Sequence, residues 1–113
     1  MKALCAIAAW LLATAIVVVH MVPPAYRPVS AASHGLEHMA IFFALGLAYG
    51  VAYQHRLRVL VVALPAFCAG VEVMQIWIPG RHARLTDFLI DTLSVLAGVG
   101  TAFILASLRR ASS

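Results

Sequence analysis

The chain has 113 residues, of which 64% are hydrophobic and only 11% are charged, and its mean hydropathy is +0.98. Soluble domains are roughly half apolar and roughly a quarter charged, so this composition excludes an ordinary soluble domain and indicates a single membrane domain over residues 1–113. The formal net charge of +4 comes without a basic run or interleaved aromatic residues, so it does not indicate nucleic-acid binding.

Four apolar segments follow one another along the chain, each close to the ~20 residues that a helix needs to cross a bilayer. They run over residues 3–22, 36–53, 59–78 and 88–108. The first resembles a signal peptide in its basic start, but its apolar run exceeds the ~7–15 residues of a typical signal, so we expect it to be retained. The segments predict an all-α fold, an antiparallel bundle of four transmembrane helices with short connections.

Small residues recur at helical spacing in the last three segments. Because they let helices approach closely in lipid, they predict tight packing within the bundle. They are Gly46 with Gly50, Ala66 with Gly70, and the group Ala97, Gly98, Gly100 and Thr101. Gly46 and Gly50 could instead pack between copies of the chain, which would make a homo-oligomer.

Aromatic and sulfur-containing residues carry weaker signals. Tyr49 and Tyr53 near the end of the second segment, and Trp77 near the end of the third, predict side chains at the membrane interface. Cys5 and Cys68 are expected at different depths, so we predict no disulfide between them.

The basic residues predict how the bundle is inserted. With the amino terminus inside, the outer side holds only Arg27, Arg81 and Arg84, and the positive-inside rule favours both termini in the cytoplasm. The basic residues then on the cytoplasmic side are Lys2, Arg56, Arg58, Arg109 and Arg110. This arrangement gathers all four acidic residues toward the outer end of the bundle; they are Glu37, Glu72, Asp87 and Asp91.

Glu72 and Asp91 lie inside segments that are otherwise apolar, where a carboxylate is costly and indicates a functional site by default. Gln75 follows Glu72 by three residues, on a neighbouring position of the same helix face. Asp91 lies one turn after Asp87. Structural roles are the alternative, because buried polar pairs also join helices through hydrogen bonds and acids near a helix N-terminus are favoured by its dipole.

Arg81 follows the Pro79-Gly80 turn, and its guanidinium suits a bidentate grip on a carboxylate or phosphate. The alternative for Arg81 is a contact with lipid phosphates at the interface. His34 and His38 are four residues apart and could face one metal, but the His-Glu-x-x-His pattern is absent, so we expect no metal site. No nucleophile–base pair or cofactor motif occurs, which favours a non-enzymatic protein without a cofactor.

These residues together resemble the VanZ-like family of small bacterial integral membrane proteins. The resemblance begins at His38 (His-Met-Ala-Ile-Phe-Phe-Ala-Leu-Gly) and covers the second to fourth segments. It continues through Glu72-x-x-Gln75, Pro79-Gly80-Arg81, and Asp87 before a helix of small residues. The family often has Asp-Lys four residues before the histidine, where this chain has His34 and Gly35. It often has Asn where this chain has Asp91, which implies a more negative site or a different ligand.

The resemblance implies a cell-envelope role in the bacterial inner membrane, because the family is associated with low-level resistance to teicoplanin-type and lipidated antibiotics. We therefore expect the protein to bind or protect an amphiphilic partner: a membrane lipid, a lipid-linked wall precursor or a lipidated glycopeptide antibiotic. The expected ligand residues in an outward-facing polar pocket are His38, Glu72, Gln75, Arg81, Asp87 and Asp91. The alternatives are a membrane enzyme with Glu72 or Asp87 as general base, and a purely structural bundle.

Overall fold

A computed structural model describes residues 2–21, 34–77 and 85–112 of the chain. Within these ranges the chain forms four α-helices and two short 3₁₀ helices, and it forms no strand. The elements are α1 (Lys2–Met21), α2 (His34–Ala52), η2 (Gln54–Arg56), α3 (Leu57–Met74), η3 (Gln75–Trp77) and α4 (Leu85–Ser112). The prediction of an all-α fold is confirmed.

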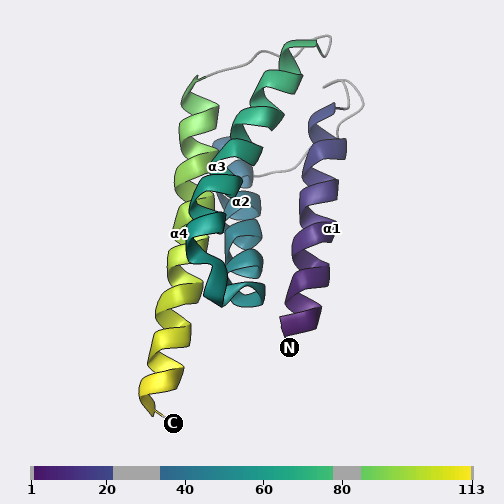
Figure 1. Ribbon diagram of the computed structural model, residues 1–113. Helices are drawn as coiled ribbons and strands as arrows, with labels where there is room; N and C mark the ends of the chain where they lie inside the picture. Colours follow the sequence, from purple (N-terminus) through teal and green to yellow (C-terminus); the bar gives the residue numbers. More distant parts are fainter. Residues whose placement is uncertain (1, 22–33, 78–84, 113) are drawn as a thin grey trace.

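Successive helices run in opposite directions, so that the start of α1, the η2 connection and the end of α4 lie toward the same end of the bundle (Figure 1). We call this the basic end; its basic residues are Lys2, Arg56, Arg58, Arg109 and Arg110. The opposite end, where α2 and α4 start and α3 stops, we call the acidic end. It carries Glu37, Glu72 and Asp91.

Three of the described helices are long and apolar enough to cross a membrane, whereas α2, predicted as a span over residues 36–53, falls short of that length. Three candidate spans are present in the described part, over Lys2–Val19, Gln54–Trp77 and Phe88–Ser112, and a third or less of each window is buried inside the bundle. The apolar part of α2 is shorter, Met39–Ala52. Large apolar side chains such as Leu11, Val62 and Leu93 are therefore exposed on the outer surface, as a lipid environment requires. The chain is a membrane protein.

The centre of the bundle is the contact between α2 and α4, which is more extensive than the contact between any other two helices described. Glycines bring the two backbones together: a Cβ placed on Gly46 would overlap the carbonyl of Val95, and one on Gly50 would lie 2.6 Å from the Cβ of Ala102. A Cβ on Gly98 would likewise overlap the backbone of α2. The predicted close packing is confirmed here, and both α2 glycines face α4. Association between copies of the chain stays a prediction.

The other small residues do not pack closely in the described bundle. A Cβ on Gly70 or Gly100 would meet nothing within 4 Å, and Ala66 and Ala97 are exposed. The prediction that these positions join helices is therefore wrong for the bundle as described. The physical reason is rotation, because only one face of a helix points toward its neighbour while the same spacing can occur on the outer face.

The core lies between these helices and includes Phe42, Leu45, Val95 and Cys68, none of which is exposed. Both Cys5 and Cys68 are free thiols, as expected. Cys68 packs toward α4, whereas Cys5 is half-buried near the start of α1.

Burial of Cys68 predicts that its thiol is protected in the folded protein. In a Cys5→Ser variant, we expect a membrane-permeant maleimide to label Cys68 at least about tenfold more slowly in mild detergent than in SDS, because labelling requires the helices to open. Labelling is measured by the mass increase with time. Equal rates in the two detergents would contradict the packing of α3 on α4.

Candidate functional site

Besides Ser94, which is 8% exposed, three polar side chains of the described residues are buried, and they lie toward the acidic end: Asp91 is 1% exposed, Gln75 is 5% exposed and Glu72 is 7% exposed. All three are candidate ligand residues from the sequence. The helices that carry them expose mainly apolar side chains to the outside. The polar groups therefore face into the bundle and away from the surface that lipid would cover.

The end of α3 places Glu72 and Gln75. Glu72 lies in the last turn of α3, and the chain then tightens into η3, which begins at Gln75. The backbone N–H of Gln75 is shared among preceding carbonyls, including those of Val71 and Glu72. Side chains three residues apart eclipse in a 3₁₀ turn, so this tightening favours Gln75 on the same side as Glu72.

Asp91 approaches the same region from α4. It lies in the second turn of the helix, close enough to the thiol of Cys68 in α3 for the two groups to interact electrostatically. Cys68 precedes Glu72 by four residues and so lies one turn deeper on the same face of α3. The two carboxylates thus come from facing helices, within about one helical turn of the same depth. We call Glu72, Gln75 and Asp91 the acid–amide group.

The other candidate residues are placed less completely. His38 lies in the first part of α2 and Asp87 in the first turn of α4, both toward the acidic end, and their side chains lie outside what the structure describes. Arg81 belongs to the connection between η3 and α4, outside the described residues. Within the described part, no group of three or more His, Cys, Asp and Glu side chains could hold a metal ion. The alternative metal site with His34 and His38 is not tested by that finding.

Sequence reasoning missed a cavity at the other end of the bundle. It has a volume of about 380 Å³, and its lining includes Trp10 of α1, Tyr49 of α2, the following Tyr53, and Arg56 of η2. Neither Glu72, Gln75 nor Asp91 lines it. Tyr49 is 7% exposed, so its side chain packs inside the bundle, and the placement of the tyrosines at the membrane interface stays a prediction. The four-residue spacing places the two tyrosines on one helix face, but it does not by itself indicate a cavity.

Comparison with known proteins shows how far the resemblance extends. No curated protein and no solved structure matches the chain. The family model described as VanZ/LLP1 matches residues 6–106 in one stretch. This range includes most of α1 and α4, so it extends beyond the three segments in which the sequence motifs lie. Because the match covers most of the chain and the fold is a bundle of apolar helices, the protein belongs to the VanZ/LLP1 family.

Proposed function

We propose that the protein binds an amphiphilic component of the bacterial cell envelope at its acidic end: a lipid, a lipid-linked wall precursor or a lipidated glycopeptide antibiotic of the teicoplanin type. The observation that carries this proposal is the burial of the acid–amide group inside a bundle with an apolar surface. Carboxylates are costly in such surroundings, and they commonly mark functional sites.

The chemistry of the group favours a particular kind of ligand. Carboxyl oxygens accept hydrogen bonds, and Gln75 adds a further acceptor together with two N–H donors. A polar head rich in donors, such as sugar hydroxyls or a primary ammonium, suits acceptors of this kind. An apolar tail would lie along the helices, because their outer side chains are apolar like the surrounding lipid. A sugar-bearing head joined to a lipid tail has this chemistry.

The remaining residues complete the proposed site. Arg81 would hold an anionic group of the ligand through its guanidinium, and His38 and Asp87 would orient the polar head. The protein would cross the inner membrane several times with both termini in the cytoplasm, because the basic end carries most of the arginines. The acidic end would then face outward, where wall precursors and antibiotics are met.

Native mass spectrometry of the protein, gently extracted from its membrane, tests this proposal. We expect a lipid-like mass to stay bound to the wild type and to be reduced at least about tenfold in Glu72→Gln and Asp91→Asn, because each isostere replaces an acceptor with an amide at nearly constant shape. Glu37→Gln is the matched control. It removes the same charge from a half-exposed position in the first turn of α2.

Loss of the bound mass in Glu72→Gln and Asp91→Asn, with retention in Glu37→Gln, supports the binding site. Equal spectra in all four proteins would overturn the proposal and favour a purely structural role for the buried carboxylates. Slow labelling of Cys68 in each Cys5→Ser background verifies that the variants are folded. A ligand that stays bound to Glu72→Gln but is no longer converted to a product would favour the enzymatic alternative.

A further inference from the structure

The cavity at the basic end is half open and is lined by parts of three helices and the turn after α2. Trp10 contributes from α1, Tyr49 from α2 and Tyr53 from the residue after it, and Leu64 and Phe67 contribute from α3. It exists because α1 packs mainly on α2 and touches α3 very little, which leaves the space between α1 and α3 only partly filled. Its volume of about 380 Å³ falls within the ~300–1,000 Å³ of ligand pockets.

Three aromatic rings that contact one another form one wall of the cavity. The rings of Trp10 and Tyr49 meet edge to face, with centroids 5.4 Å apart, and Tyr49 stacks on Tyr53 at 6.0 Å. The indole N–H of Trp10 donates a hydrogen bond of 3.0 Å to the hydroxyl of Tyr53. This bond joins α1 to the end of α2. The Tyr53 hydroxyl accepts it, and a hydroxyl that accepts one bond can still donate its own hydrogen.

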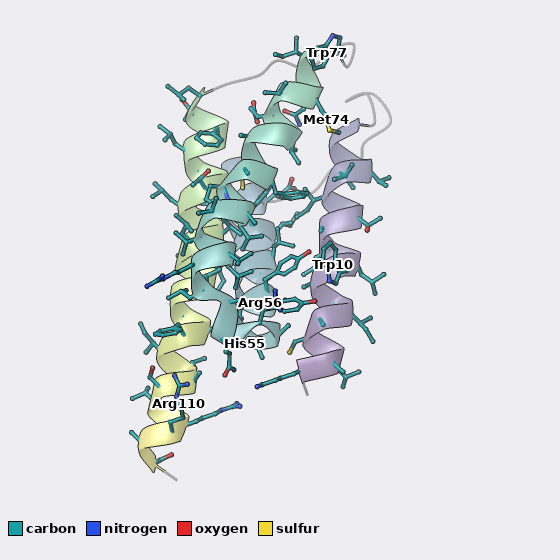
Figure 2. All side chains as sticks on the ribbon, viewed as in Figure 1. Trp10, His55, Arg56, Met74, Trp77 and Arg110 are labelled. Atoms are coloured by element: carbon teal, nitrogen blue, oxygen red, sulfur yellow. The ribbon has the colours of Figure 1, made fainter. Side chains whose placement is uncertain are left out.

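Positive charge lies beside the apolar space. Arg56, in η2, is part of the cavity lining and is exposed, and Figure 2 shows it near Trp10 and on the same side of the bundle as His55. The four acidic residues of the chain, Glu37, Glu72, Asp87 and Asp91, all belong to the parts of α2, α3 and α4 nearer the acidic end. In the part of the chain that the structure describes, the mouth of the cavity is thus cationic and its walls are apolar.

We propose that this cavity binds an anionic phospholipid from the adjoining leaflet, with one acyl chain between α1 and α3 and the phosphate held by Arg56 and Tyr53. An acyl chain fills an apolar space that water would fill poorly. A guanidinium and a hydroxyl are both donors that suit phosphate oxygens. The site is separate from the acid–amide group and does not depend on the function proposed there.

Competition between lipids in native mass spectrometry tests this second site. Delipidated protein in mild detergent is titrated with phosphatidylglycerol and with phosphatidylcholine of the same chains. We expect the anionic lipid to bind about fivefold more tightly, because one basic residue near an anionic membrane surface contributes about that much affinity. Arg56→Gln is expected to abolish this preference. Arg58→Gln, which removes the same charge two residues away from outside the cavity lining, is expected to keep it.

A second variant tests the acyl chain. Ala63 lines the cavity from α3 and is exposed, so Ala63→Phe fills space without disturbing the packed core. We expect it to weaken both lipids at least about fivefold, with the preference between them unchanged. Equal binding of the two lipids to the wild type, equal losses in Arg56→Gln and Arg58→Gln, or unchanged affinity in Ala63→Phe would each overturn the proposal. None of these variants alters Glu72 or Asp91, so failure here is distinct from failure of the proposed function.

Discussion

Replacing Gly46 with leucine is expected to prevent α2 from packing on α4 and to lower the free energy of unfolding by more than ~3 kcal/mol, the upper range for an overpacked core. A side chain at Gly46 would meet the backbone of Val95, and a backbone carbonyl cannot turn aside as a flexible side chain can. Only separation of the two helices would make room. The free energy of unfolding is measured by titrating Gly46→Leu, in the Cys5→Ser background, with SDS in mixed micelles. The rate of Cys68 labelling reports the unfolding.

Gly70→Leu is the matched control for this prediction. Gly70 also lies within an apolar helix, but a side chain there meets open space, so the same substitution should leave stability unchanged or raise it by up to ~1 kcal/mol through helix propensity. A Gly46→Leu variant as stable as Gly70→Leu would show that α2 and α4 are not in close contact.

Truncation of Phe42 is expected to produce the second large loss of stability. Phe42 is fully buried in the core, and Phe42→Ala removes a ring that contacts its neighbours on all sides. We expect a loss of about 3 kcal/mol, the low end of the ~3–5 kcal/mol range for such truncations in soluble cores. The low end applies because the ring stays in lipid after the helices separate. The substitution therefore removes packing contacts but changes the apolar transfer free energy little.

The neighbouring Phe43 provides the control within the same turn of α2. Its ring is 36% exposed toward the outside of the bundle, so Phe43→Ala should lower the free energy of unfolding by less than ~1 kcal/mol in the same SDS titration. Similar losses in the two variants would mean that α2 is rotated relative to the orientation described here.

The candidate site illustrates where reasoning from sequence succeeds in a membrane protein. Glu72 and Asp91 stand out because acids are rare inside apolar segments, and each proved buried between helices. Their positions along the chain also predicted that both lie toward the same end, because antiparallel helices alternate in direction. The role of Arg81 remains a proposal, since it belongs to the connection outside the described residues.

The basic-end cavity illustrates the opposite case. Tyr49 and Tyr53 have the spacing and position of interfacial aromatics, and nothing local distinguishes them from lipid-facing residues. Trp10 and Tyr53 lie 43 positions apart in the sequence, and their contact arises only when α1 lies against the end of α2. A cavity depends on how two helices diverge, and that is a property of their packing and not of either helix alone.

The sequence by itself determined the apolar helices, their alternating directions, and the separation of the basic end from the acidic end that holds the buried carboxylates. These properties follow from composition and position along a helix, because length and hydropathy decide whether a segment suits a membrane. The tertiary structure alone decided which glycines join helices, that Tyr49 is buried, and that a cavity lies between α1 and α3. Each of these depends on the rotation and tilt of a helix against its neighbours, which is set by side chains far apart in the chain.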